Sequence, residues 1–335
     1  MRSGTIRIRV ASTTSPTMVP GYSHRPGNHC GSAALRNLLA FHGLDISEEL
    51  AFGLGAGACF YYVVLEGESP SRFTNGRTAR LEEQFVELTG APIDLETTDD
   101  AADSWERARA VVDSGRPTIL LTDLYHLDHY GRSAHFPGHA VVLAGYDGER
   151  AYLSDTAFDE LQTTSLGSLA LARHERHPAY PLSGHMFHVP DAGSLGDLTE
   201  AAPRTVERAA RRMLEPELGE FQGLPALRRF ADEVGAWPEA AEDWKWCARF
   251  AYQVIERRGT GGGNFRRMHA RFLEEVGYGE AALAYDAAER WTALAGALLA
   301  ASESDAPEPG LWSDVSGEAA RVLEAEERLW NALRP

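Results

Sequence analysis

Cys30 is the residue of this sequence best placed to act as a nucleophile. It precedes an apolar pattern, with Leu35 and Leu39 at helical spacing, that predicts a helix over residues 31–42. Unpaired amides and the dipole at a helix N-terminus stabilise a thiolate and lower the pKa of the thiol. The small residues at positions 31–33 leave room for a substrate. The alternative interpretation is that Cys30 is a small buried residue, as most free cysteines are.

A histidine and an aspartate flank a predicted β-hairpin. Apolar runs predict strands over residues 140–145 and 151–154, and the Asp-Gly pair at 147–148 between them is a strong turn signal. His139 stands just before the first strand, and Asp155 stands just after the second. A carboxylate beside an imidazole holds the ring in the orientation that a general base needs.

The length of the hairpin loop decides whether these two side chains meet. A two-residue loop at 147–148 would place His139 and Asp155 on opposite faces of the hairpin. We favour a three-residue loop over 146–148, because it also aligns three apolar side chains on the face of His139. The strand partners in that register are Gly145–Glu149, Leu143–Ala151, Val141–Leu153 and His139–Asp155.

Each of these residues also has a plain structural interpretation. His139 would cap the start of a strand, and Asp155 would begin a turn. The order cysteine, histidine, aspartate along the chain is that of papain-like cysteine enzymes, so the joint occurrence favours catalysis. The other two cysteines, Cys59 and Cys247, stand among apolar residues and are predicted to lie in the core.

The elements that carry these residues belong to a chain of two predicted domains. The 335 residues, of which 44% are hydrophobic and 24% charged, are enough for two globular cores. Short apolar runs alternate with helical stretches before residue 190, whereas helical periodicity dominates after it. We predict an α+β domain over residues 1–192 and an all-α domain over 193–335, with the boundary in 190–197. The predicted strands cover 119–121, 140–145, 151–154 and 186–189, and the predicted helices cover 31–42, 78–89, 101–113, 202–215, 224–234, 237–258, 264–276, 280–301 and 316–333.

Net charge and cysteine content exclude several classes of protein. A formal net charge of -17 argues against a general nucleic-acid binder and against adhesion to anionic membranes. The N-terminal stretch contains no apolar run of signal-peptide length, and the longest apolar runs, such as 293–301, are too short to span a membrane. Three cysteines without CxxC spacing indicate neither a disulfide framework nor a zinc knuckle. We therefore expect a cytoplasmic protein.

Several segments together resemble one known family. These segments are His29-Cys30-Gly31-Ser32, Arg36-Asn37-Leu38-Leu39, Phe52-Gly53-Leu54-Gly55-Ala56-Gly57, His135-Phe136-Pro137-Gly138-His139 with the hairpin, and Arg258-Gly259-Thr260-Gly261-Gly262-Gly263-Asn264-Phe265-Arg266. The chain is similar to the butirosin biosynthesis acyltransferase family, both in its N-terminal domain and in the helical domain that follows in many members. The N-terminal part is in turn similar to the cysteine peptidases that process bacteriocin leaders, which have a papain-like fold.

The resemblance implies a papain-like α+β domain with acyltransferase activity. In the founding case an aminoacyl group passes from an acyl carrier protein thioester to an amine of an aminoglycoside. By that resemblance Cys30 is the nucleophile, His139 the base and Asp155 the residue that orients it. No cofactor is implied beyond the phosphopantetheine on the donor, and the expected partners are the carrier protein and a small-molecule amine, with a homodimer left open. A cysteine hydrolase and a non-catalytic binding module are the alternatives.

The chain departs from the papain-like pattern at the oxyanion hole. Papain-like peptidases usually place a glutamine about six residues before the cysteine, and here that position is His24. The candidate oxyanion donors are therefore His24, Asn28 and the amide of Cys30. The missing glutamine argues more strongly against a peptidase than against an acyltransferase, because a thioester is a more reactive electrophile than a peptide bond. We expect Asp123 and His135 to line the same cleft.

Histidine and aspartate residues also cluster in the segment that leads to the hairpin. Both residue types are common metal ligands. No HExxH or CxxC spacing accompanies them, so the sequence predicts no metal site. The clustered residues are His126, Asp128, His129, His135 and His139.

A glycine-rich loop precedes the predicted helix over 264–276. It consists of Gly261, Gly262, Gly263 and Asn264, and glycine amides at a helix N-terminus can bind an anion. The loop lacks the GKS/T of a P-loop and the strand of a dinucleotide site. Three interpretations stay open: a clamp for the phosphate of phosphopantetheine, a wall between the two domains, and a plain interhelical turn.

Arginines surround that loop. Residues 249–271 contain six arginines and one glutamate, whereas the chain as a whole is acidic. We predict that these arginines, Arg266 and Arg267 among them, form a basic patch on which an acidic carrier protein docks.

Overall fold

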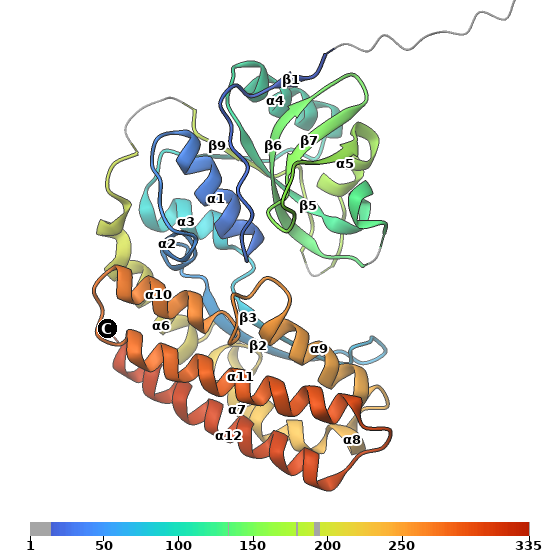
Figure 1. Cartoon of the computed structure of the whole chain (residues 1–335), viewed down its shortest axis with the longest axis vertical. Coiled ribbons are helices and arrows are strands. Elements are labelled where there is room, and N and C mark those ends of the chain that lie inside the picture. The colour runs from blue at the N-terminus through green and yellow to red at the C-terminus, as the bar shows by residue number, and fades with distance from the viewer. Residues whose placement is uncertain (1–14, 133, 179, 191–194, 335) are drawn as a thin grey trace, which may run out of the picture.

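A seven-stranded antiparallel sheet forms the centre of the N-terminal half in this computed structural model (Figure 1). The structure describes residues 15–132, 134–178, 180–190 and 195–334. The strands of the sheet are β1 (Thr17–Met18), β4 (Asp94–Glu96), β5 (Thr118–Asp123), β6 (Pro137–Tyr146), β7 (Arg150–Ser154), β8 (Gln162–Ser165) and β9 (Met186–His188). Their order is β4-β9-β5-β6-β7-β8, and β1 pairs with the C-terminal end of β6.

Helices cover both faces of this sheet. They are α1 (Cys30–Phe41), α2 (Glu48–Leu54), α3 (Leu81–Thr89), α4 (Ala101–Asp113) and α5 (Leu166–Arg173), with the short 3-10 turns η1 (Leu124–His126) and η2 (Asp128–Tyr130). Leu121 and Val142 belong to a hydrophobic cluster that includes α1, whereas Leu120 and Val141 belong to a second cluster with α4 and α5. Successive side chains along each strand therefore point alternately into two hydrophobic cores, one on each face of the sheet. Because both faces are buried, β6 is apolar almost throughout.

Local sequence signals explain several of the helix boundaries. The hydroxyl of Ser47 accepts a hydrogen bond from the Leu50 amide at 2.8 Å and begins α2, and Asp100 accepts from the Ala102 amide at 2.9 Å and begins α4. The predicted helices at 31–42, 78–89 and 101–113 are confirmed as α1, α3 and α4. The four predicted strands are confirmed as β5, β6, β7 and β9. Helices α2 and α5 were not predicted.

After β9 the described chain forms helices only. They are η3 (Leu198–Ala201), α6 (Ala202–Leu214), η4 (Gly219–Phe221), α7 (Gly223–Glu233), η5 (Val234–Ala236), α8 (Trp237–Ala240), α9 (Trp244–Glu256), α10 (Arg266–Glu275), α11 (Ala281–Glu303) and α12 (Pro309–Ala332). The single helix predicted over 237–258 is wrong. The chain breaks between α8 and α9, where the Asp243 carboxylate accepts hydrogen bonds from the hydroxyls of Ser69 and Ser71 at 2.7 and 2.5 Å. Helix α12 begins earlier than predicted, because Pro309 suits the first helical turn.

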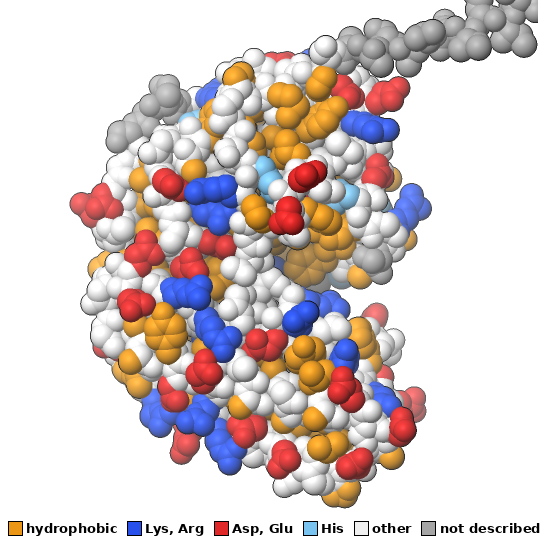
Figure 2. Space-filling view, viewed as in Figure 1, with side chains coloured by type: hydrophobic (Ala, Val, Ile, Leu, Met, Phe, Trp, Pro, Cys, Tyr) orange, Lys and Arg blue, Asp and Glu red, His pale blue; other side chains and the backbone are white. Residues whose placement is uncertain are grey.

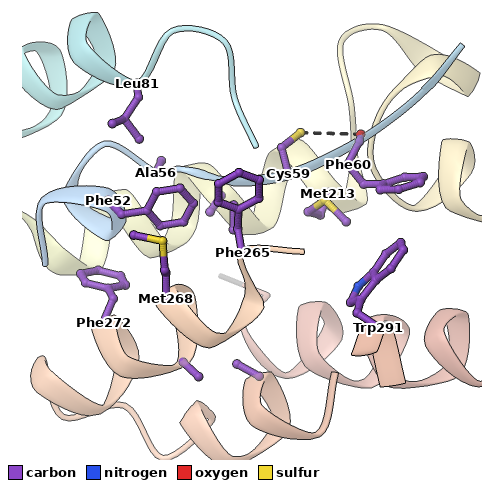
Figure 3. Packing of buried hydrophobic residues seen from close by; sticks show 14 of the residues in the cluster. Phe52, Ala56, Cys59, Phe60, Leu81, Met213, Phe265, Met268, Phe272 and Trp291 are labelled. Carbon is purple, nitrogen blue, oxygen red and sulfur yellow. Dashed lines mark hydrogen bonds between the residues drawn. The ribbon is translucent and has the colours of Figure 1, made fainter. Parts of the chain in front are cut away.

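An unpredicted hairpin joins the two halves of the chain. Strands β2 (Ala58–Val64) and β3 (Arg72–Arg77) pair with each other and lie among the C-terminal helices (Figure 1). Figure 3 shows Phe60 of β2 and Phe52 of α2 in the same hydrophobic cluster as Phe265 and Trp291. A single core thus extends from the helix that carries Cys30 into the helical half.

The observed fold class is the predicted one, a mixed helix-and-sheet part followed by a helical part. The predicted boundary at 190–197 falls partly on residues 191–194, which lie outside the described residues, as does most of the N-terminal stretch inspected for a signal peptide. Even the longest helices of the described chain lack the apolar stretch needed to cross a membrane.

Candidate active site

Cys30 is the first residue of α1, where the start of the helix is tightly fixed. His29 caps the helix, because its imidazole Nδ1 accepts a hydrogen bond from the Ser32 amide at 3.2 Å. The Glu48 carboxylate accepts the amides of Asn28 and His29 at 2.9 and 2.6 Å. Cys30 therefore lies at the positive end of the α1 dipole, and its side chain is partly exposed.

His139 and Asp155 form a buried pair beside Cys30. The Nε2 atom of His139 lies 2.9 Å from Oδ2 of Asp155, and Asp155 is fully buried. This contact leaves Nδ1 of His139 as the ring nitrogen that can exchange a proton with the thiol. The three residues predicted to act together are therefore brought together by the fold.

The electrostatics of this group favour a thiolate and an imidazolium. Burial would raise the pKa of the Cys30 thiol, but the interaction with His139 outweighs burial and lowers that pKa to about 7. Burial would lower the pKa of His139, but the Asp155 carboxylate raises it to about 10. The pKa of Asp155 is held below its usual range, because His139 and His129 outweigh the effect of burial. Between the first two values, Cys30 and His139 carry opposite charges.

The turn of the hairpin differs from both loops considered in the sequence analysis, over residues 147–148 and 146–148. The Asp147 amide donates a hydrogen bond to the Arg150 carbonyl at 2.9 Å, so residues 148–149 form the turn. Tyr146 pairs with Ala151 beside it. The favoured register, in which Gly145 pairs with Glu149, is therefore wrong.

A β-bulge in the hairpin places His139 and Asp155 on the same face of the sheet, although the predicted register is wrong. The register shifts between Leu143 and Gly145, where β1 packs so closely that a Cβ atom on Gly145 would lie 2.7 Å from a β1 carbonyl oxygen. Leu143 consequently pairs with Leu153. His139 and Asp155 become diagonal neighbours on one face of the sheet instead of direct partners.

Aromatic side chains cover the His139–Asp155 pair. His129 places its Nε2 atom 3.0 Å from the same Oδ2 of Asp155. The ring of Tyr130 meets His139 edge-on, with 5.6 Å between centroids, and Phe158 packs against Tyr130. These contacts keep water from the pair. Sequence reasoning considered His129 only as a metal ligand, and it missed Tyr130 and Phe158 because no periodic pattern marks them.

Sequence reasoning also missed a buried carboxyl group beside the nucleophile. A Cβ atom on Gly31 would lie 2.1 Å from Oε1 of Glu82, so the carboxyl group of Glu82 packs directly against this glycine. Glu82 lies on the first turn of α3 and is 4% exposed. Burial, Glu83 and the charge of Cys30 raise the pKa of Glu82 to about 8, against a smaller opposing effect of Arg77. The carboxyl group is therefore largely protonated at neutral pH and can donate a hydrogen bond.

The two side chains predicted as oxyanion donors have other partners. Nδ1 of His24 lies 2.6 Å from the Ser154 hydroxyl, and Nε2 lies 2.9 Å from the Phe158 carbonyl. His24 thus has no free N–H for an oxyanion, which corrects the prediction. The side-chain amide of Asn28 lies 3.5 Å from Glu48 Oε2, and this contact engages at most one of its two N–H groups, so Asn28 stays a candidate donor. The amides at the start of α1 remain as donors.

Asp123 and His135, predicted to line the cleft, form a pair of their own. Nδ1 of His135 lies 2.8 Å from Oδ2 of Asp123, which is buried at the end of β5. The other carboxylate oxygen accepts the Phe136 amide at 2.9 Å. Phe136 faces the guanidinium of Arg77, with 5.7 Å from its carbon to the ring centroid. The pair therefore fixes the chain just before His139.

Three of the four amides in the glycine-rich loop are engaged within the protein and are not available to a phosphate. The amides of Gly262, Gly263 and Asn264 already donate to Thr260 Oγ1, Glu256 Oε1 and the Ile255 carbonyl, each at 3.0 Å. The Glu256 carboxylate at the end of α9, which accepts the Gly263 amide, would also repel a phosphate. Of the three open interpretations, these contacts contradict the phosphate clamp and fit the wall between the helical half and the start of α1.

Close contacts show what the loop packs against. A Cβ atom on Gly259 would lie 2.5 Å from the Asn28 carbonyl, and one on Gly263 would lie 2.7 Å from the Ala288 carbonyl. Phe265 stacks on Phe52 with 5.6 Å between centroids and meets the cap residue His29 edge-on. Figure 3 shows Phe265 beside Phe52 among the buried hydrophobic residues.

The predicted basic patch does not form around Arg266. Its side chain is fully buried, and its Nε lies 2.7 Å from Oε1 of Glu326. Arg267 pairs with Glu289 at 2.9 Å, and Arg271 pairs with Glu49 at 2.8 Å. In Figure 2, cationic and acidic side chains are interspersed over the helical half. The prediction that Arg266 takes part in docking is therefore wrong, because its side chain is buried against Glu326, and acidic residues distant in sequence also neutralise Arg267 and Arg271.

The geometry defines the class of this protein. A cysteine at a helix N-terminus, packed beside an antiparallel sheet that carries a histidine and then an aspartate, is the arrangement of a papain-like cysteine-enzyme domain. Here that domain is followed by a helical region.

Two family models match successive parts of the chain. Residues 29–156 match the family model described as butirosin biosynthesis protein H, N-terminal. Residues 167–333 match a domain of unknown function, DUF4872. Among curated proteins, none is significantly similar to the chain.

Solved structures are also similar to this chain. A crystal structure of a C39-like peptidase from Bacillus anthracis aligns with 14% identity, over 52% of this chain and 96% of that chain. The TM-score of 0.36 is too low to support an argument.

Proposed function

We propose that this protein transfers an acyl group from a carrier-protein thioester, through Cys30, to an amine acceptor. The observation that carries the proposal is the Cys30 thiol, whose pKa is lowered to about 7 beside the buried His139–Asp155 pair. A nucleophile that is ionised at neutral pH and has an adjacent base is what covalent acyl transfer requires.

In the first step the Cys30 thiolate attacks the thioester carbonyl carbon. The bond between that carbon and the donor sulfur breaks as the tetrahedral intermediate collapses. The His139 imidazolium gives its proton to the departing thiolate, and the acyl group remains on Cys30. Asp155 keeps the ring oriented throughout.

In the second step the amine attacks the acyl carbon on Cys30. His139, now neutral, accepts a proton from the amine nitrogen, and the Cys30 thiolate leaves as the amide forms. Water competes with the amine at this stage. The aromatic cover formed by Tyr130 and Phe158 over His139 favours the amine by excluding water from the base.

The oxyanion of both intermediates needs donors in place of the missing glutamine. We assign this role to the amides at the start of α1, together with the protonated carboxyl of Glu82. Its Oε1 lies directly against Gly31, the residue after the nucleophile. A neutral carboxylic acid in a buried site donates a strong hydrogen bond to a developing oxyanion.

The family supports a place for this chemistry in antibiotic biosynthesis, because its name refers to the biosynthesis of butirosin. The reaction needs no cofactor of its own, since the phosphopantetheine arm arrives on the donor carrier protein. We place the reaction in the cytoplasm, with the carrier protein and a small-molecule amine as partners.

Product analysis separates acyl transfer from hydrolysis. The protein is incubated with an acyl-loaded carrier protein, with and without a panel of amines including aminoglycosides, and the products are identified by mass spectrometry. Acyl transfer predicts an amide that forms only with an amine and only when Cys30 is present. Release of the free acid at an undiminished rate in the presence of every amine would instead establish a cysteine hydrolase.

A further inference from the structure

Two histidines and a glutamate converge outside the candidate active site. The ligand atoms of His126, His135 and Glu175 all lie within 4.8 Å of one another. They come from η1, from the segment before β6 and from the segment after α5, so the fold brings three separate parts of the chain together. His126 Nε2 already lies 2.7 Å from Glu175 Oε2.

The surroundings of His135 are those of a metal ligand. Its Nδ1 is held at 2.8 Å by the buried carboxylate of Asp123, which leaves Nε2 free to coordinate. The ring of Tyr125 stacks on His135 with 4.1 Å between centroids and fixes its plane. A carboxylate behind a ligating histidine orients the ring and raises its basicity in many metal sites.

We propose that His126, His135 and Glu175 bind a divalent transition-metal ion of the zinc class. Two imidazoles and one carboxylate are a common ligand set for Zn²⁺ and leave a fourth position for water. His135 is 42% exposed along its side chain, which gives the ion a path from solvent. The bound ion links the segment before β6 to the segment after α5 and stabilises the chain next to Phe136.

This site revises the expectation from the sequence. Of the five clustered residues, His129 and His139 bond to Asp155, and Asp128 accepts the Ser165 amide at 2.7 Å. The remaining two residues, His126 and His135, lie close to Glu175. Glu175 is too distant in sequence for a spacing motif to include it.

A second histidine–glutamate pair offers a matched control. His188 Nε2 lies 3.0 Å from Glu96 Oε1, in the same kind of contact as His126 and Glu175. No other histidine joins that pair in the metal-ligand clusters of the described residues. Glu96→Gln therefore removes an equivalent carboxylate without touching the proposed site.

The test is Zn²⁺ binding by titration calorimetry to protein stripped with a chelator. It is carried out in the Cys30→Ala background, because a thiolate beside His139 also binds zinc. Co²⁺ provides a second readout, since a site of low coordination number with nitrogen ligands gives visible absorption bands. Circular dichroism and thermal unfolding of the metal-free variants check that each one folds.

The proposal predicts one Zn²⁺ per chain. It predicts weaker binding by more than about 10-fold for His135→Ala, His126→Gln and Glu175→Gln, and by about 10- to 100-fold for Asp123→Asn. Glu96→Gln retains full affinity. If the Cys30→Ala protein binds no Zn²⁺, or if folded His126→Gln and His135→Ala bind it as tightly as their parent, the proposal is overturned.

Discussion

The Nε2 atom of His139 lies 2.9 Å from Oδ2 of Asp155, although the two residues are not strand partners. The contact crosses the hairpin diagonally, and a bulge beside Gly145 makes it reachable. Because Asp155 raises the pKa of His139, and His139 lowers that of Cys30, one buried carboxylate controls the state of the nucleophile.

The first prediction concerns the pH dependence of thiol alkylation. The rate of Cys30 alkylation by iodoacetamide should rise through an apparent pKa of about 7, below the ordinary 9.0. Asp155→Asn removes the charge that favours the imidazolium, so the thiol pKa rises and alkylation at pH 7 slows by about 10-fold. Peptide mapping identifies the alkylated cysteine, and Asp147→Asn at the hairpin turn serves as the control. An unshifted profile for Asp155→Asn contradicts the coupling.

A second prediction tests whether Glu82 contributes to catalysis as a hydrogen-bond donor or only by filling space. Glu82→Leu removes the donor and should lower kcat for acyl transfer by about 10²- to 10³-fold, the usual effect of losing one oxyanion donor. Glu82→Gln keeps a donor of the same length and should retain most of the activity. If both variants lose activity equally while remaining folded, Glu82 does not act as a hydrogen-bond donor.

A third prediction concerns stability against pH. The folded state holds the Glu82 proton up to about pH 8, whereas the unfolded chain releases it near 4.5. This contribution to stability is fully present below the lower value and is lost as pH rises towards the higher one, by at most about 1.4 kcal/mol per pH unit.

Urea unfolding across this pH range measures the effect. Glu82→Gln should flatten the decline in the free energy of unfolding, whereas Glu87→Gln, on the exposed face of α3, should leave it unchanged. A decline of the same slope in wild type and Glu82→Gln would show that another group is responsible.

A fourth prediction follows from the burial of Arg266. Its partner Glu326 also accepts hydrogen bonds from the indoles of Trp291 and Trp330 at 2.6 and 2.5 Å. Arg266→Met leaves that carboxylate buried without its cation and should lower the free energy of unfolding by about 3–5 kcal/mol. Arg267→Met, at a partly exposed ion pair, should lower it by less than about 1 kcal/mol. Equal effects in urea unfolding would contradict the structural role.

Local signals in the sequence were sufficient for much of the site. Helical spacing placed Cys30 at the start of α1, and two apolar runs around an Asp-Gly pair placed His139 and Asp155 on adjacent strands. The pairing of these two side chains was predicted, but for the wrong reason. The bulge lies where β1 packs against Gly145, and local sequence patterns do not encode this contact between distant segments.

Long-range contacts account for what the sequence could not show. Glu82 reaches Gly31 from another helix, and Glu326 neutralises Arg266 from 60 residues away. Arginine content alone predicted a basic patch, because the sequence does not reveal which carboxylates will lie beside it. The hairpin β2–β3 was missed because its apolar run lacks the alternation of a strand with one exposed face.

The central claim is that Cys30 carries the acyl group, and intact-mass analysis tests it most directly. The protein is incubated with an acyl-thioester donor, and any adduct is located by peptide mapping. We predict one acyl group on Cys30, absent in Cys30→Ala, that is lost as an amide when an amine is added. An adduct of equal yield in Cys30→Ala, or acyl transfer to the amine by that variant at the wild-type rate, would contradict the account.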